Sequence, residues 1–194
     1  MMNEANNMKL LLDLVPFGSR VLDLGCGNGE MLAYLCERRG CSGYGVEIDD
    51  ENIKACVRRG VDVLQLNLEE GLNIFADHSF DVVLQLNTLQ NIRNLEQVLR
   101  ETARVGQKVV ASFPNFAHWA NRFSVLKGRM PVTRTLPYQW YDTPNIRVGT
   151  FADFEVLAEK NGLRVEKSFG IQNGRVVKFM PNLRASVAVF LLKQ

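Results

Sequence analysis

Three glycines at alternate positions form the part of the sequence most suited to hold a ligand. Residues 21–24, VLDL, are a short apolar run with one acid, which is typical of a buried parallel strand. The run leads directly into Gly25, Gly27 and Gly29. Glycine permits a positive φ and leaves room for a ligand against the backbone. Residues 30–39 then have apolar side chains at helical spacing, so the start of a helix would point free N–H groups at the loop.

The spacing of the glycines favours one class of ligand. A dinucleotide fingerprint requires glycine at its first, third and sixth positions, and the sixth position here is Glu30. A glutamate in the first helical turn would repel a pyrophosphate but tolerate a ligand with a cationic centre. A second short strand, 43–47, ends at Glu47, about twenty residues after the glycines, where a carboxylate can accept two ribose hydroxyls. The paired acid favours a nucleoside ligand over a strand, turn and helix that bind nothing.

These features resemble the first motif of class I methyltransferases, a hydrophobic-hydrophobic-acid-x-Gly-x-Gly-x-Gly string. The resemblance implies S-adenosylmethionine, or S-adenosylhomocysteine, as the cofactor, with the glycines against its methionine half and Glu47 on its ribose. Asn67 would lie over the adenine; many relatives carry an acid there, but an amide still offers a donor and an acceptor. The cofactor-binding residues expected from this motif and the strand ends are Asp23, Gly25, Cys26, Gly27, Gly29, Glu47, Ile48, Asn67, Leu68 and Gln85. No metal site is expected.

Strands and helices alternate along the first 113 residues, which predicts a parallel sheet with helices on both faces. Further strands are expected at 62–66, 80–86 and 108–113, and helices at 8–15, 49–59 and 95–105. The helix 8–15 is expected to act as a lid or an edge cover, and Gly106 is expected to end the helix 95–105.

The last part of the chain predicts how the sheet is completed. After a helix at 150–161, two strands are expected at 164–169 and 185–192, with only a loop, 170–183, between them. These strands must therefore pair as a hairpin, which reverses the final strand. The sequence thus predicts an α/β, Rossmann-like class I methyltransferase fold, with a seven-stranded, mostly parallel sheet and an antiparallel last strand.

Composition limits the classes of function. With 194 residues, 46% hydrophobic and 23% charged, the chain is expected to form one domain over residues 1–194. A net charge of +2 gives no electrostatic case for nucleic acid or an anionic membrane. The four cysteines contain no C-x-x-C pair; Cys26, Cys36 and Cys56 are expected to be buried, and all to be free thiols of a reducing cytosol. The polar start lacks a signal-peptide pattern, which favours a cytoplasmic protein.

Residues 115–149 interrupt the alternation of strands and helices. This insert is expected to hold a helix at 117–126 and an ordered loop at 128–143 over the active end of the sheet. Its basic residues are Arg122, Lys127, Arg129, Arg134 and Arg147, against the single acid Asp142. A connection this long within a domain is usually functional, which favours a substrate or partner surface. A proline-rich connector whose aromatics cover the edge of the core is the alternative.

Three strings around this insert resemble the signature of the MetW family. They are SFPNF at 112–116, GRMPVT at 128–133 and LPYQWYDTPNI at 136–146, and the likeness runs from about 20 to 190. Arg147 departs from the pattern, since relatives often show a histidine there. The resemblance implies bacterial methionine biosynthesis, in which the family works alongside homoserine O-acyltransferase in the acylation of homoserine.

Two hypotheses about function follow. In the first, the protein binds S-adenosylmethionine and serves homoserine O-acyltransferase as a partner or regulatory subunit. In the second, it is an active methyltransferase on a small-molecule acceptor, since a positioned acceptor can react without a general base. His118 is the one candidate base; a role at a helix start or in packing is the alternative. Asn87 is not followed by Pro-Pro-Tyr, so an adenine or glutamine nitrogen is not expected as acceptor. Self-association stays open.

Overall fold

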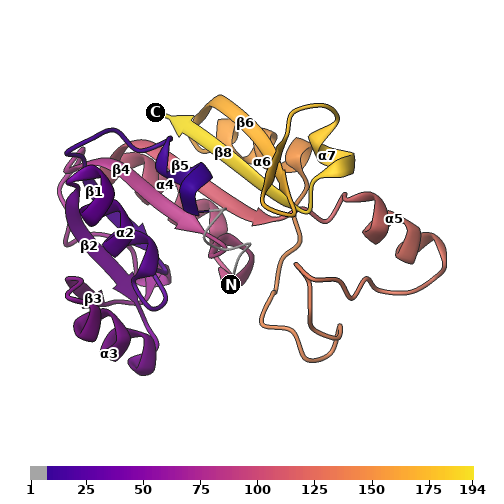
Figure 1. Cartoon of the computed structure of the whole chain (residues 1–194), viewed down its shortest axis with the longest axis horizontal. Coiled ribbons are helices and arrows are strands. Elements are labelled where there is room, and N and C mark those ends of the chain that lie inside the picture. The colour runs from indigo at the N-terminus through magenta and orange to yellow at the C-terminus, as the bar shows by residue number, and fades with distance from the viewer. Residues whose placement is uncertain (1–7) are drawn as a thin grey trace.

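A computed structural model describes residues 8–194, and these contain one eight-stranded sheet with the order β3-β2-β1-β4-β5-β8-β6-β7 (Figure 1). The strands are β1 Arg20–Leu24, β2 Ser42–Glu47, β3 Val63–Gln65, β4 Phe80–Leu86, β5 Gly106–Pro114, β6 Arg164–Gln172, β7 Arg175–Val177 and β8 Val187–Lys193. The first five strands pair in parallel, and β8 pairs antiparallel with both β5 and β6. This confirms the mostly parallel sheet with a reversed last strand.

The expected count of seven strands is wrong by one. The segment 170–183 is not only a loop: β6 extends to Gln172 and turns back into β7, and α7, Pro181–Arg184, follows. Asn173 and Gly174 make the turn with φ values of 50° and 74°. Positive φ at both central residues defines a two-residue hairpin turn for which Asn-Gly is the strongest sequence signal.

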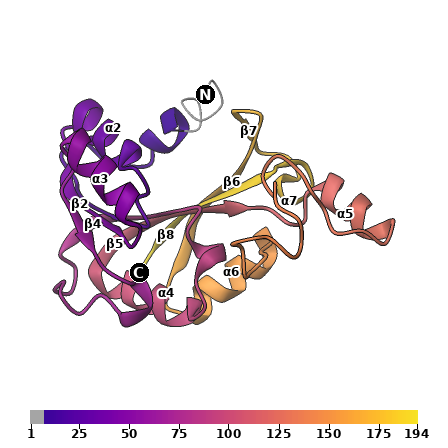
Figure 2. The same cartoon turned by 90° about the horizontal axis from the view of Figure 1, so that it is seen from below.

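Helices cover both faces of the sheet, as predicted (Figure 2). The covering helices are α2 Glu30–Arg39, α3 Asp50–Arg59, α4 Leu95–Val105 and α6 Phe151–Lys160. A further helix, α5 Trp119–Leu126, and the single turns η1 Leu68–Glu70 and η2 Leu89–Asn91 are also present. The sheet separates α2 and α3 from α4 and α6. The caps follow the sequence: the Asp49 carboxylate accepts from the N–H of Asn52, and the Thr150 hydroxyl accepts from that of Asp153.

Each face of the sheet carries its own apolar cluster. On the α4 and α6 side, the rings of Phe113, Phe154 and Phe190 pack together, with centroids 4.8 to 5.9 Å apart. On the other side, residues 8–12 are helical, and Leu11 is buried against α2. Residues 1–7, part of the expected single domain, lie outside the described residues. None of the described helices is long and apolar enough to span a membrane.

Gly106 ends α4 after Val105, as expected, but it does so in an extended conformation. Its φ is −116°, and it is already the first residue of β5. A Cβ atom at this position would lie 2.4 Å from Cγ2 of Val83 on the neighbouring strand. Glycine is therefore needed here because β4 packs closely against it, and not because of its backbone angle.

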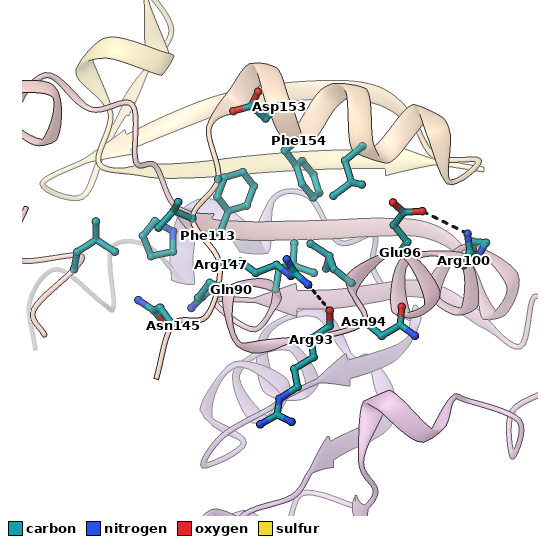
Figure 3. Close-up of a pocket in the computed structure, with 17 residues that line it drawn as sticks. Gln90, Arg93, Asn94, Glu96, Arg100, Phe113, Asn145, Arg147, Asp153 and Phe154 are labelled. Carbon is teal, nitrogen blue, oxygen red and sulfur yellow. Dashed lines mark hydrogen bonds and ion pairs between the residues drawn. The ribbon is translucent and has the colours of Figure 1, made fainter. Parts of the chain in front are cut away.

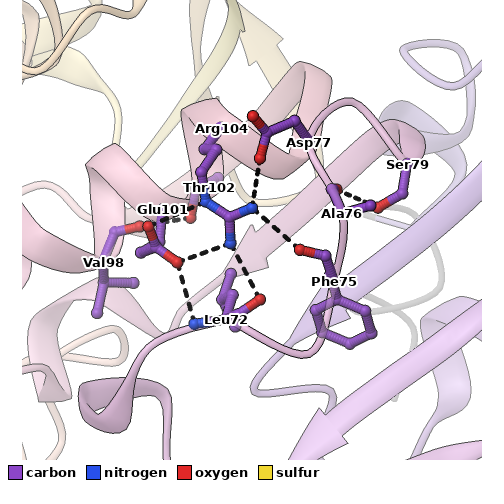
Figure 4. A network of polar contacts seen from close by, with 9 residues as sticks. All are labelled: Leu72, Phe75, Ala76, Asp77, Ser79, Val98, Glu101, Thr102 and Arg104. Carbon is purple, nitrogen blue, oxygen red and sulfur yellow. Dashed lines mark hydrogen bonds and ion pairs between the residues drawn. The ribbon is translucent and has the colours of Figure 1, made fainter.

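Arg104 near the end of α4 ties down the chain that leads into β4 (Figure 4). Its guanidinium lies 2.6 Å from the Asp77 carboxylate and 2.9 Å from that of Glu101, and it donates to the carbonyls of Phe75 and Leu72. The hydrogen bond from Arg104 lowers the pKa of Glu101. This network fixes the start of β4, the strand whose far end reaches the candidate site.

The cysteines are free thiols, as expected, but one of the burial predictions is wrong. Cys41 and Cys56 are buried and Cys26 is half-buried, whereas Cys36 lies exposed on α2. The apolar neighbours of Cys36 in the sequence occupy the buried side of that helix, so its own side chain faces the solvent.

Candidate functional site

The glycine loop lies at the carboxyl end of β1, held against the ends of two neighbouring strands. The N–H groups of Gly25 and Cys26 donate to the carbonyl of Val46 on β2, over 2.8 and 3.1 Å. From the end of β4, the hydroxyl of Thr88 donates to the carbonyl of Leu24 over 2.9 Å. The loop is therefore held in place by hydrogen bonds to β2 and to the segment that follows β4.

The three glycines of the loop are required for different reasons. All have positive φ: 73° for Gly25, 55° for Gly27 and 74° for Gly29. A Cβ at Gly25 would lie 2.6 Å from Oγ1 of Thr88, and one at Gly29 would lie 2.9 Å from Sγ of Cys56. A Cβ at Gly27 would meet no atom within 4 Å. Gly27 thus faces open space, which is the place where a ligand can approach the backbone.

Glu47, at the end of β2, lies directly against this loop. One carboxylate oxygen accepts from the N–H of Gly27 over 2.9 Å. The other accepts from the N–H groups of Ile48 and Asp49 over 2.8 and 3.0 Å. These bonds fix the carboxylate beside Gly27, and its oxygens retain lone pairs that can accept from a ligand's hydroxyls.

Asp23 places a second carboxyl group beneath the loop. The residue is 2% exposed, and burial together with the nearby charge of Glu47 raises the pKa of its carboxyl to about 7. Burial also raises the pKa of the Cys26 thiol, with the charges of Asp23 and Glu47 adding to the effect. Among residues 8–194, no cationic side chain pairs with Asp23 or Glu47.

These two carboxyl groups and the glycine loop fit the cofactor implied by the sequence. Two acidic groups without a cationic partner favour a ligand that carries positive charge, and S-adenosylmethionine has a sulfonium and an ammonium. The open side of Gly27 leaves space for the ligand, and Glu47 presents acceptors for its ribose hydroxyls.

Of the remaining expected site residues, Ile48, Asn67 and Leu68 follow the ends of β2 and β3, whereas Gln85 lies within β4. Ile48 is exposed beside Glu47, and Leu68 is buried at the start of η1. Asn67 caps η1, with its side-chain Oδ1 accepting from the N–H of Glu69. The structure does not bring Gln85 to the loop. Its side chain is fully buried and donates to Oγ1 of Thr102 on α4 over 2.8 Å, so it belongs to the packing between β4 and α4.

Two adjoining cavities lead from the glycine loop along the carboxyl ends of β4 and β5, and we call them together the strand-end groove. The first has a volume of about 270 Å³ and the second about 400 Å³. The first is lined by Met8, Leu11, Cys26, Asn28, Glu30, Met31, Leu86, Asn87, Ser112, Ile171, Val187 and Val189. Met8 and Leu11 agree with a covering role for the first helix.

The insert 115–149 supplies the outer wall of the second cavity. Arg134, Thr135, Pro137 and Tyr138 line it opposite Asn87, which both cavities share. The returning part of the insert therefore lies over the end of the sheet, as predicted for the loop. In contrast, α5 stands away from the sheet in both views (Figures 1 and 2).

Asn87 was not among the site residues expected from the sequence. Asn87 has a φ of 55°, which is uncommon for a residue with a side chain, although asparagine tolerates it better than most. Such positions often occur at functional sites. The position of Asn87 after a central strand was the only available signal. The sequence predicted the loop that contains Tyr138 over the active end of the sheet, but it named neither Tyr138 nor Ser112 as a site residue, because distant segments form the groove.

His118 lies at the start of α5, where its Nδ1 accepts from the N–H of Ala120. The residue is 7% exposed, and burial lowers the pKa of the imidazole. It lines neither cavity of the strand-end groove. The structure thus favours the helix-start alternative over a catalytic base.

Solved S-adenosylmethionine-dependent methyltransferases share this fold. One from Mesorhizobium loti aligns over 100% of both chains with a TM-score of 0.73 and 15% identity. Magnesium protoporphyrin IX methyltransferase from Synechocystis, solved with bound S-adenosylhomocysteine, aligns over 100% of this chain and 84% of its own, with a TM-score of 0.69 and 15% identity. The chain therefore has the fold of class I methyltransferases.

The family is more specific. The family described as methionine biosynthesis protein MetW matches residues 5–192. A relative from Rhodopirellula baltica, the bifunctional methionine biosynthesis protein MetXA/MetW, is 38% identical over 193 residues, which cover 92% of this chain. The chain spans 31% of the length of that relative. The protein belongs to the MetW family, and the resemblance noted in its aromatic strings is confirmed.

Proposed function

We propose that the protein binds S-adenosylmethionine, or S-adenosylhomocysteine, and acts as a partner or regulatory subunit of homoserine O-acyltransferase. The observation that carries the first part is the open side of Gly27 between two acids that lack a cationic partner within residues 8–194. The sulfonium and ammonium groups of the ligand would be attracted to these carboxylates. Glu47 would accept from the ribose hydroxyls, and Ile48 would offer an apolar surface to the adenine.

Calorimetric titration with both ligands tests the binding site. Gly27→Val should abolish binding, because its side chain would fill the space where the ligand approaches. Gly128→Val is the matched control: Gly128 also has a positive φ, 72°, and no atom within 4 Å of a built Cβ, but it lies in the insert. Both variants place a valine at a positive φ and so introduce similar backbone strain. Only Gly27→Val also fills the space in which the ligand would lie.

Glu47→Ala should also abolish binding, and Glu51→Ala on the exposed side of α3 serves as its control. Thermal unfolding verifies that each variant is folded. If both site variants retain wild-type affinity, the assignment of the site is wrong.

The partner role is supported by the name of a relative and by an exposed surface of this protein. The relative from Rhodopirellula baltica carries MetXA and MetW in one chain, and proteins that are fused in one organism often work together in another. The surface is α5, which exposes Trp119, Phe123 and Leu126 at positions that share one side of the helix. Leu126 is 82% exposed. Large exposed apolar groups on a projecting helix, next to basic residues, are typical of an interface.

A pull-down with purified homoserine O-acyltransferase tests this surface. Leu126→Lys should weaken the complex at least tenfold, because it would place a charge in the centre of the apolar contact. Ile74→Lys is the control, since Ile74 is also well exposed, at 62%, but lies outside the insert. Equal binding of both variants would place the interface elsewhere.

Regulation requires that ligand and partner influence one another. If the partner shifts the affinity for S-adenosylmethionine, the ligand must shift the affinity for the partner by the same factor. Titration of the ligand with and without the acyltransferase measures this factor. Equal affinities would exclude a regulatory role for the ligand.

The strand-end groove supports a second candidate function, methyl transfer to a small molecule. The groove joins the glycine loop through Cys26 and Asn28 and ends under the insert, so an acceptor there would lie beside the reacting end of the cofactor. Positioning within the groove could supply most of the acceleration. Formation of S-adenosylhomocysteine on incubation with candidate acceptors tests this function, and Tyr138→Ala should reduce the rate by changing the wall of the groove.

A further inference from the structure

A third cavity lies between the start of α4, α6 and the end of the insert (Figure 3), and it adjoins the second cavity of the strand-end groove, with which it shares Gln90, Pro114 and Asn145. We call it the α4–α6 cavity. Its volume of about 430 Å³ is within the range of small-molecule sites. It is lined by Leu89, Gln90, Arg93, Asn94, Leu95, Glu96, Arg100, Phe113, Pro114, Leu136, Asn145, Arg147, Val148, Gly149, Asp153, Phe154 and Leu157. Neither the family nor the expected cofactor accounts for it.

The floor of this cavity is apolar and already packed. Phe113 of β5 and Phe154 of α6 are 4% and 5% exposed, and their ring centroids lie 4.9 Å apart. Phe113 also stacks on Phe190, which fixes it from the other side. Leu157 adds a side chain from the next turn of α6. A ligand with an apolar ring or chain therefore meets a rigid surface, and little ordering is needed to bind it.

Arg147 provides a fixed positive charge at the edge of this floor. Its Nε donates to the carbonyl of Ile92 over 3.1 Å, and its Nη2 donates to that of Arg93. Figure 3 shows the contact between Arg147 and the carbonyl of Arg93. The two bonds hold the guanidinium in place but leave donors on Nη1, and no carboxylate pairs with it among residues 8–194.

The acids that line the cavity are already engaged. Glu96 lies 3.7 Å from Arg100 and 3.0 Å from Lys160. Asp153 accepts from the hydroxyl of Thr150 over 2.6 Å as part of the cap of α6. The hydroxyl does not neutralise Asp153, but the lining carries Arg93, Arg100 and Arg147 against two acids, so its net formal charge is positive. The free N–H groups in the first turn of α4, which Asn94 does not cap, add partial positive charge at the same end.

We propose that the α4–α6 cavity binds a small amphipathic carboxylate, with its apolar body on Phe113 and Phe154 and its carboxylate on Arg147. This site is independent of S-adenosylmethionine binding, because it shares neither Asp23 nor Glu47 nor the glycine loop. A guanidinium that is already held in position forms strong, directional hydrogen bonds with a carboxylate.

Calorimetric titration with a matched pair of probes tests the proposal. The probes are 3-phenylpropionate and 3-phenylpropanamide, which have the same apolar body and differ in the charge of the head group. We expect the carboxylate to bind at least tenfold more tightly than the amide. Equal affinities, or no binding of the carboxylate, would overturn the proposal.

Two variants locate the binding. Arg147→Gln should lower the affinity for 3-phenylpropionate to that for the amide, while Arg129→Gln, in the insert but outside the cavity, should leave it unchanged. Leu157→Trp should abolish binding of both probes by filling the cavity. Thermal unfolding confirms that each variant is folded. Binding that survives Leu157→Trp would place the probe elsewhere on the protein and overturn the assignment.

Discussion

Asp23 should make the stability of this protein fall as the pH rises from about 4 to about 7. The pKa of its carboxyl is about 7 in the folded protein, against 3.8 for the ordinary side chain. Between these values the folded state holds a proton that the unfolded state releases. The free energy of unfolding therefore decreases with rising pH over this window and levels off above pH 7. A difference of about three pKa units corresponds to about 4 kcal/mol.

Asp23→Asn isolates this effect, because an amide has the same shape and does not ionise. The variant and the wild type should have similar stability near pH 4, and the variant should be more stable by up to about 4 kcal/mol at pH 8. Titrating groups that are not coupled to Asp23, including Glu101 and His118 with their lowered pKa values, contribute equally to both proteins and cancel in the difference.

Urea unfolding at pH 4, 5, 6, 7 and 8 measures the difference in unfolding free energy between the two proteins. Asp142→Asn, at an exposed acid of the insert, is the control and should follow the wild type at every pH. Parallel curves for wild type and Asp23→Asn would show that the carboxyl titrates normally, and would refute the reasoning from burial and from the charge of Glu47.

Two further predictions concern the fold. Arg104→Ala should destabilise the protein by about 3 kcal/mol in urea unfolding, because it leaves the carboxylate of Glu101 and two backbone carbonyls without their donor; a loss below about 0.5 kcal/mol would show that the network contributes little. Gly106→Ala should cost about 1–3 kcal/mol, since its Cβ would lie 2.4 Å from Val83, and a variant as stable as the wild type would mean that β4 and β5 can move apart at no cost.

The sequence alone indicated most of the fold. Apolar runs predict strands, apolar residues at helical spacing predict helices, and glycines mark their ends, and all three are local signals. They located β1, β4, α4 and α6 closely. The overlooked strand β7 also had a local signal, the Asn-Gly pair at 173–174. Gly106 ends α4 as the sequence predicted, but the sequence did not reveal that Val83 on β4 also requires glycine at this position through close packing.

The sequence also determined the core of the candidate site, because Gly25 to Gly29 and Glu47 come from two adjacent strands with a known spacing. Only the tertiary structure decided which side chains face the same space. It turned Gln85 toward α4 and placed His118 at a helix start. It also assembled the strand-end groove and the α4–α6 cavity from segments far apart in the chain. Hydrophobic periodicity reports which residues are buried, but the cavities depend on how the insert returns across the sheet, and that path is determined by long-range packing.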